Sequence, residues 1–231
     1  MRGAYCPSQH MTLLLIYLPL GALIGLLAGL LGIGGGGLAV PALLWSFSHQ
    51  GVAPSVRVHL AIGTSLATIV FTALSAIVAQ QRLRAIDWSV TLMLAPATVM
   101  GSFASGYLAG FVPPTVLQDA FSLFLALISL QLLSNWRPAA HWMLPARPFL
   151  FVVGLAIGAV SAMIGIGGGS LTVPFLSACN IDIRRAIAVS ATQTLCIAIF
   201  GASGFVLAGL HQGALPPWSI GYRKSRPVLP P

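Results

Sequence analysis

Apolar stretches of about 20 residues, the length of a membrane-spanning helix, follow one another along this sequence and end near its few charged side chains. Only 6% of the residues are charged, whereas soluble domains carry about 25%. Eleven Lys or Arg and three Asp or Glu side chains cannot hydrate the surface of a 231-residue chain. We therefore predict an all-α, polytopic bundle of transmembrane helices whose main partner is the lipid bilayer.

The net charge of +8 needs its own explanation, because strongly basic proteins often bind nucleic acid. In membrane proteins Lys and Arg collect in the loops that stay cytoplasmic, so topology accounts for the charge and no nucleic-acid partner is expected. The three cysteines, Cys6, Cys179 and Cys196, show neither CxxC nor Cys/His ligand spacing. We therefore expect no disulfide framework, no metal and no cofactor.

The apolar pattern divides the chain into two halves joined by its longest polar segment. We predict a first half at 1–136, a connecting loop at 137–148, a second half at 149–222 and a polar tail at 223–231. Spanning segments are expected at about 11–31, 60–79, 88–111, 116–133, 149–165 and 186–210, with short apolar segments at 38–47 and 171–178.

The second half repeats the first, and the repeat centres on glycine. Residues 21–41 and 154–174 align with ten identities in 21 positions, including an uninterrupted Gly-Ile-Gly-Gly-Gly block that begins at Gly32 and at Gly165. The sequence therefore predicts an internal duplication. Its further matched positions are Pro41 with Pro174, Arg57 with Arg184, and Thr64-Ser65 with Ala191-Thr192.

An odd number of apolar segments separates equivalent points of the two halves, so the halves are predicted to enter the membrane from opposite faces. Such inverted-topology repeats are common in secondary transporters. The positive-inside rule assigns the face with most arginines to the cytoplasm. That face holds Arg82, Arg84, Arg137, Arg147, Arg184 and Arg185, and the other holds Arg2 and Arg57, although the tail cations Arg223, Lys224 and Arg226 nearly equalise the sides.

The glycine blocks predict helices that are broken within the membrane. Each glycine costs a helix about 1 kcal/mol relative to alanine, and non-helical backbone at membrane depth must be buried in protein or line a cavity. We expect Leu38 and Leu171 to begin short half-helices whose N–H groups and positive dipole ends hold a small anion. Pro41 and Pro174 would lie early in these helices, where a missing N–H does little harm.

The glycines have two other interpretations. Glycines also let helices pack closely, which accounts well for the spacing of Gly21, Gly25 and Gly29. Glycine-rich loops also bind nucleotide phosphates, but here no Lys-Ser/Thr follows and the flanking segments are membrane spans.

The blocks Gly29–Pro41 and Ala162–Pro174, each followed by Ala-x-Gly-Thr-Ser or Ala-x-Ser-Ala-Thr, resemble the sulfite exporter TauE/SafE family of membrane permeases. The resemblance covers about residues 11–222. It implies seven or eight spans in two repeats and export of sulfite, or of small organosulfur anions such as sulfoacetate, across the bacterial inner membrane.

The resemblance also implies a substrate site made of glycine backbone and of polar side chains on the helices that follow. Hydroxyl and amide groups there could replace part of an anion's hydration shell, or could equally bond to the preceding helical turn. The predicted substrate-binding residues are Gly34, Gly35, Gly36, Gly37, Gly167, Gly168, Gly169, Ser170, Thr64, Ser65, Thr192 and Gln193, and the structural motif residues are Gly32, Pro41, Gly165 and Pro174.

Few titratable side chains lie near the spans. Arg57 and Arg184 could attract anions at the two mouths, but anchoring of helix ends at the headgroups is favoured. His59 could sense protons, but an interfacial role is favoured. No Asp or Glu lies within an apolar span, so no buried carboxylate relay is expected. No nucleophile–base pair indicates an enzyme, and a homo-oligomer is left open.

The end of the sequence departs from the repeat. Past the span at 186–210 only 21 residues remain, whereas the first half continues with two further spans. We expect that the last nine residues are out of frame or truncated and that two helices are missing; the alternative is a naturally short protein with a polar tail. The rival to a transporter is therefore a non-transporting membrane protein or an inactive permease.

Overall fold

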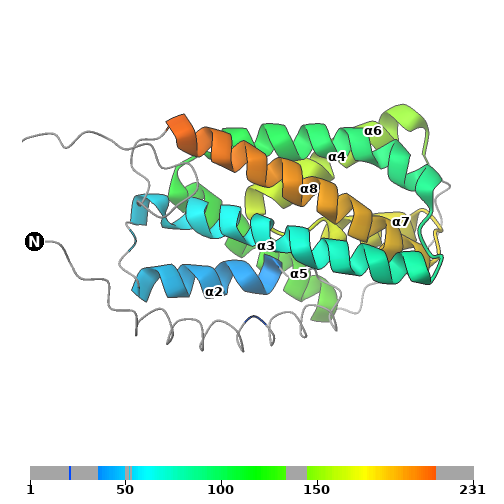
Figure 1. Cartoon of the computed structure of the whole chain (residues 1–231), viewed down its shortest axis with the longest axis horizontal. Coiled ribbons are helices and arrows are strands. Elements are labelled where there is room, and N and C mark those ends of the chain that lie inside the picture. Colours follow the sequence, from blue (N-terminus) through cyan, green and yellow to red (C-terminus); the bar gives the residue numbers. More distant parts are fainter. Residues whose placement is uncertain (1–20, 22–35, 50–51, 53, 134–144, 212–231) are drawn as a thin grey trace, which may run out of the picture.

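A computed structural model describes residues 21, 36–49, 52, 54–133 and 145–211 of the chain. All regular structure in these residues is helical (Figure 1). The helices are α2 (Gly36–His49), α3 (Pro54–Arg82), α4 (Trp88–Ala109), α5 (Pro114–Leu133), α6 (Arg147–Ile164), α7 (Gly169–Ala178) and α8 (Ile183–His211).

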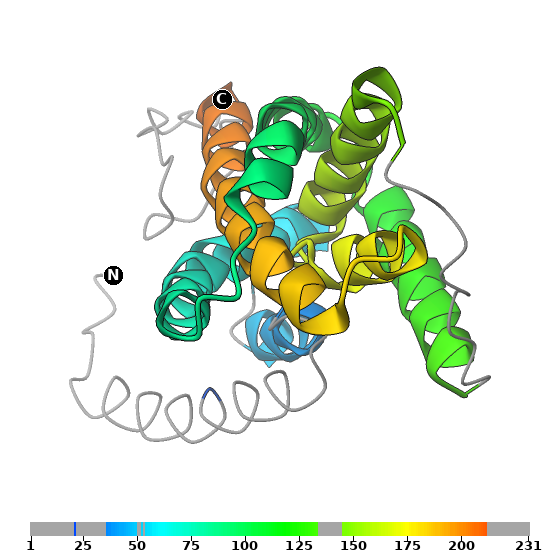
Figure 2. The same ribbon diagram turned by 90° about the vertical axis from the view of Figure 1, so that its right-hand side faces the viewer.

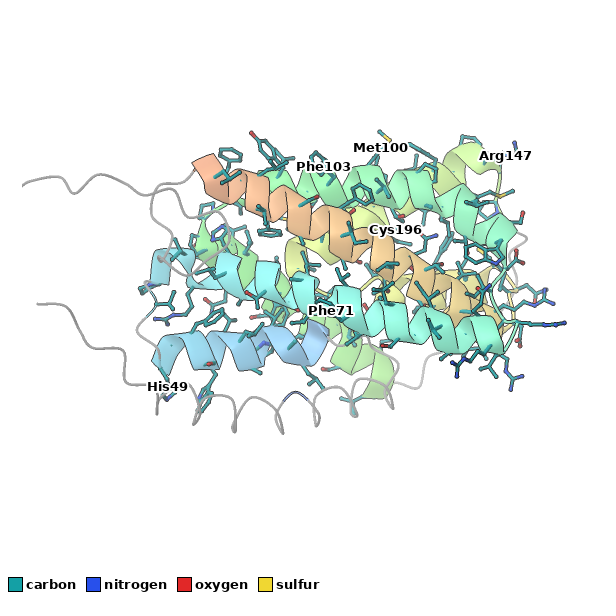
Figure 3. All side chains as sticks on the ribbon, in the orientation of Figure 1. His49, Phe71, Met100, Phe103, Arg147 and Cys196 are labelled. Carbon is teal, nitrogen blue, oxygen red and sulfur yellow. The ribbon has the colours of Figure 1, made fainter. Side chains whose placement is uncertain are left out.

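Five of these helices, α3, α4, α5, α6 and α8, are long and apolar enough to cross a membrane. Their outer faces carry large apolar side chains, such as Phe71 on α3 and Met100 and Phe103 on α4 (Figure 3). Phe71 is 73% exposed. Exposure of such a large apolar side chain is unfavourable in water but not in lipid. The chain is a multi-pass membrane protein.

Local sequence signals explain several helix boundaries. Asp87 caps the N-terminus of α4 by accepting hydrogen bonds from the backbone N–H groups of Ser89 and Val90. Pro114 and Pro148 stand at the starts of α5 and α6, where a missing N–H is harmless. The turn between α7 and α8 contains Asn180 at φ 60°, a left-handed conformation that asparagine tolerates.

Helix α4 packs closely between α6 and α8 (Figure 2). Glycines allow this approach. A Cβ added at Gly158 of α6 would lie 2.9 Å from Thr98 Cα, and one at Gly204 of α8 would lie 2.7 Å from the Phe103 carbonyl oxygen. Ser105 of α4 also donates a 2.7 Å hydrogen bond to the carbonyl oxygen of Ala159 in α6. Small residues thus let the backbones touch, as is common between membrane helices.

The helices α3 and α8 cross each other and run in opposite directions (Figure 1). The shorter helices α2 and α7 both begin in the middle of the molecule, and they run to opposite ends. Figure 3 labels His49, the last residue of α2, at one end, and Arg147, the first residue of α6, at the other. Helix α7 ends on the side where α6 begins, so α6 and α7 form a hairpin whose tip lies inside the bundle.

One expectation about the prolines is wrong. The short helices begin at Gly36 and Gly169, two residues before the predicted starts, so Pro41 and Pro174 are each the sixth helical residue. At that position a proline removes a helical hydrogen bond. The carbonyl groups left without their helical donor are those of Gly37 and Ser170.

Several predictions fall outside the described residues. These are the span at 11–31 apart from residue 21, residues 137–144 of the connecting loop, the tail at 223–231, and the motif residues Gly32, Gly34 and Gly35.

Candidate functional site

The centre of the molecule holds a tight turn of four residues, Gly165–Gly168, that joins α6 to α7; we call it the glycine turn. Helix α6 ends where Gly165 adopts φ +75°, a left-handed conformation that favours glycine. The N–H groups of Gly165 and Ile166 close this end by donating to the carbonyls of Ala162 and Ser161, at 3.2 and 3.0 Å. All four residues of the turn are buried.

Helices α3 and α8 enclose the glycine turn from two sides. On α3, Ser65 is fully buried and its Oγ donates a 3.0 Å hydrogen bond to the carbonyl oxygen of Gly165. On α8, the nearest atoms to Cβ positions built on Gly167 and Gly168 are Thr194 Cγ2 and Ile197 Cδ1, each at 2.7 Å. The turn is therefore held by one specific bond to α3 and by close packing against α8.

The first residue of α2 lies directly against this turn. A Cβ added at Gly36 would meet the Gly165 carbonyl oxygen and would lie 2.8 Å from Ile166 Cα and 2.9 Å from Ile69 Cδ1. Two glycines from the two duplicated blocks, Gly36 and Gly165, are thus in backbone contact across 129 positions of sequence. Only glycine at position 36 permits this approach.

Two helix N-termini consequently meet at the glycine turn, those of α2 and α7. The N-cap of α7 is Gly168, which has no side chain to accept from the helix, and the N–H groups of Gly169 and Ser170 occupy the first two helical positions. A helix offers no acceptor of its own to its first N–H groups, and its N-terminus carries partial positive charge. This arrangement favours a small anion.

The polar pairs predicted on the following helices take different positions. Thr64 is half-buried on α3, next to the fully buried Ser65. Thr192 donates to the Val189 carbonyl at 2.6 Å within α8. Gln193 is fully buried, and its amide bonds to α4: Oε1 accepts from Thr98 Oγ1 at 2.7 Å. Its Nε2 donates to the Thr91 carbonyl at 2.9 Å. In this structure Gln193 joins two helices, whereas Ser65 contacts the glycine turn.

Arg57 and His59 hold loops at one end of the bundle. Arg57 Nη2 and Nε donate to the carbonyl oxygen of Val52, at 2.8 and 3.2 Å, and Nη1 donates to Ser48 Oγ at 3.3 Å. His59 Nε2 lies 3.0 Å from the carbonyl oxygen of Ala109, at the end of α4. Arg184 is exposed at the start of α8. Arg57 is thus bonded within the protein, to Ser48 of α2 and to Val52.

Sequence reasoning missed several hydroxyl groups near the glycine turn. The buried side-chain oxygens of Ser161 in α6 and of Thr172 in α7 have no hydrogen-bond partner among the described residues. The same holds for the predicted Ser170 and for Ser177, which lies at the far end of α7. Ser and Thr in membrane helices usually bond to their own backbone. No pattern in the sequence distinguishes those that do not. The described residues hold no cluster of three or more His, Cys, Asp or Glu side chains that could bind a metal.

Comparison with known proteins gives a consistent result. The family model described as sulfite exporter TauE/SafE matches residues 17–222. A protein of Haemophilus influenzae named "probable membrane transporter protein" is 33% identical over 212 residues, covering 91% of this chain and 80% of the relative. A protein of Methanocaldococcus jannaschii with the same kind of name is 26% identical over 217 residues, covering 93% and 79%. No solved structure matches.

Proposed function

Because the chain belongs to the sulfite exporter TauE/SafE family, we propose that it exports a small sulfur-containing anion by alternating access. The proposed substrates are sulfite, sulfoacetate and related organosulfonates, and the proposed location is the bacterial inner membrane. The substrate would bind at the glycine turn, where the N-termini of α2 and α7 meet.

One observation carries this proposal, the backbone contact between Gly36 and the residues Gly165 and Ile166. It brings the N-termini of two short helices to one buried point, although their motifs are far apart in sequence. Discontinuous helices whose N-termini point at an anionic group are a recurrent feature of secondary transporters. Partial positive charge at a dry site also attracts an anion more strongly than the same charge in water.

The helix directions support an inverted repeat. Helices α3 and α8, which carry the aligned residues Arg57 and Arg184, run in opposite directions, and so do α2 and α7 (Figure 1). A two-fold axis in the membrane plane would relate such pairs. Among the described arginines, Arg82, Arg84, Arg147, Arg184 and Arg185 lie at the end where α6 begins and Arg57 lies at the other, so we assign the richer end to the cytoplasm.

The burial of the site supports alternating access. Ser65 is 0% exposed, and every residue of the glycine turn is buried, so an ion can reach the turn only if neighbouring helices move. The contacts that must change are those of α3 and α8, because these two helices enclose the turn. The hydrogen bond from Ser65 to Gly165 joins α3 to the turn. It breaks if α3 moves away from the turn, and it stays intact if α3 and the turn move together.

The test is efflux of radiolabelled sulfite and sulfoacetate from proteoliposomes that contain the full chain. We expect efflux from the native protein and its loss in Gly36→Val, because the added side chain separates α2 from the glycine turn. Gly63→Ala is the matched control, since its Cβ would lie 3.8 Å from the nearest atom, Phe205 Cβ, an ordinary contact. Efflux by Gly36→Val at the native rate contradicts the site. If the native protein moves no sulfur anion, the substrate class is wrong and a non-transporting role is favoured.

A further inference from the structure

The unpartnered hydroxyls near the glycine turn contrast with most hydroxyls in the rest of the described bundle. Thr72 donates to the Ile69 carbonyl at 3.0 Å, and the buried Ser190 donates to the Ile187 carbonyl at 2.8 Å, each within its own helix. Thr172 makes no such bond, although its residue is 1% exposed. A buried hydroxyl without a partner costs free energy, and a ligand is one reason for a fold to retain it.

Thr172 stands beside the N-terminus of α7. Its Oγ1 lies 3.4 Å from the position that a Cβ of the N-cap residue Gly168 would take. Thr194 approaches the same position from α8, with its Oγ1 at 3.9 Å. Ser170, the second residue of α7, also has a buried hydroxyl without a partner in the described part of the chain. Hydroxyl groups from two helices thus surround the N-terminus that is proposed to hold the anion.

These donors are all electrically neutral. On α8 the nearest arginines to Thr194 are at the helix start, where Arg185 is nine residues away, or about 14 Å along the axis. On α3, Arg57 precedes Ser65 by eight residues, or about 12 Å. Neither helix therefore places a cationic side chain beside the turn.

A site without cationic side chains discriminates between anions by their charge. The free energy of moving an ion out of water rises with the square of its charge, so a dianion costs about four times as much as a monoanion of the same size. Hydroxyl and backbone N–H donors can replace part of the hydration of one charge, but they supply no opposite charge to balance a second. A sulfonate head carries one charge, as does hydrogensulfite, whereas sulfite and sulfate carry two on a single head. Sulfoacetate carries its second charge on a separate carboxylate, so its sulfonate head alone would meet these donors.

We infer that Thr172 and Ser170 are substrate-binding donors and that the site accepts singly charged sulfur oxyanions, namely hydrogensulfite and alkanesulfonates, in preference to the dianions sulfite and sulfate. This inference rests on the proposed function. It adds the charge state of the substrate and the residue Thr172, and it assigns a donor role to the hydroxyl of Ser170, which the sequence had already placed in the site.

The charge preference is tested by efflux of methanesulfonate, sulfite and sulfate in mildly acidic and mildly basic buffer. Methanesulfonate stays a monoanion and sulfate a dianion throughout, whereas hydrogensulfite loses its proton near neutrality. We expect methanesulfonate efflux to be the same in both buffers, sulfite efflux to fall several-fold in basic buffer, and sulfate neither to leave nor to compete. Faster sulfite efflux in basic buffer, or competition by sulfate, overturns the charge preference. Absence of efflux of every anion overturns the proposed function instead.

The role of Thr172 is tested by Thr172→Val, Thr172→Ser and the control Thr72→Val, whose native hydroxyl bonds to its own helix. Loss of a donor to a charged ligand should reduce methanesulfonate efflux about tenfold or more in Thr172→Val, with recovery in Thr172→Ser and no change in the control. The melting temperature of Thr172→Val should not fall, because no partner is lost. The inference is contradicted if Thr172→Val keeps the native rate of efflux. It is also contradicted if the melting temperature of this variant falls together with its efflux, because the hydroxyl is then structural.

Discussion

Thr98 Oγ1 donates a 2.7 Å hydrogen bond to Gln193 Oε1, which links α4 to α8 at a buried point between residues 95 positions apart. Gln193 completes the link by donating from Nε2 to the Thr91 carbonyl at 2.9 Å. A buried amide so bonded fixes the relative position of the two helices, because any slip along the interface leaves polar atoms unpaired.

This pair predicts coupled effects on stability. Thr98→Val leaves Gln193 Oε1 buried without its donor and should destabilise the protein by about 1–2 kcal/mol. In a Gln193→Leu background the same substitution should cost less, because the orphaned acceptor is absent and Thr98 has alternative acceptors in its own helix at Leu94 and Ala95. Reversible unfolding in detergent of both single variants and the double variant measures the coupling. Strictly additive effects would show that the two side chains do not depend on each other.

Ser65→Ala is predicted to loosen the glycine turn. The Gly165 carbonyl is held by Ser65 Oγ at 3.0 Å inside the bundle, and its loss should cost about 1–2 kcal/mol. Because the turn presents the N-terminus of α7, efflux should also slow. Ser122→Ala is the control, since Ser122 is exposed and bonds to Gln118 in its own helix. Thermal unfolding and efflux should be measured on the same preparations, and equal behaviour of the two variants contradicts the assigned role of Ser65.

The packing of α4 against α8 predicts a severe effect of Gly204→Ala. The new Cβ would lie 2.7 Å from the Phe103 carbonyl oxygen and 2.8 Å from the Tyr107 nitrogen, both backbone atoms that cannot rotate away. Overpacking of this kind costs about 1–3 kcal/mol. Gly63→Ala should be neutral, because its Cβ has an ordinary contact at 3.8 Å. Melting temperatures in detergent compare the two, and a stable Gly204→Ala protein would refute the close approach.

Arg57→Lys should affect stability and leave substrate affinity unchanged. The guanidinium donates to Val52 from two nitrogens and to Ser48 from a third, a geometry that a lysine ammonium does not reproduce. We expect a loss of about 0.5–1.5 kcal/mol in unfolding free energy. The KM for efflux should stay within about twofold of the native value, because a charge is retained at this position. A large rise in KM with native stability would instead indicate that Arg57 binds the anion.

The sequence predicted the membrane-spanning helices best, because the bilayer constrains their length and composition. Bilayer thickness dictates the length of an apolar run, so a span predicted at 88–111 corresponds to α4 at Trp88–Ala109. Asp87, which caps the helix, and Trp88, its first residue, mark its start. By contrast, Gly36 and Gly169 begin helices that were predicted to start two residues later, since tertiary contacts around the turn compensate for the poor helix propensity of glycine.

The partners of individual side chains could not be predicted. Gln193 was predicted to bind substrate, but its bonds to α4 depend on which helix lies beside α8, and residue spacing does not contain that information. Thr172 carries no distinguishing pattern either. Its significance comes from the bond it does not make within the described residues, which only three-dimensional contacts reveal.

The position of α4 has a consequence for how the protein is made. Helix α4 is synthesised well before α6 and α8, yet its close backbone contacts and its buried hydroxyl bonds are with those later helices. It is also less apolar than α3 and α8. During insertion α4 is therefore in place before its native partners, and its small and polar residues face lipid, water or the insertion machinery. Helix α4 can adopt its native packing only after α8 has been inserted. The native contacts of this helix, which lies in the middle of the sequence, therefore form late.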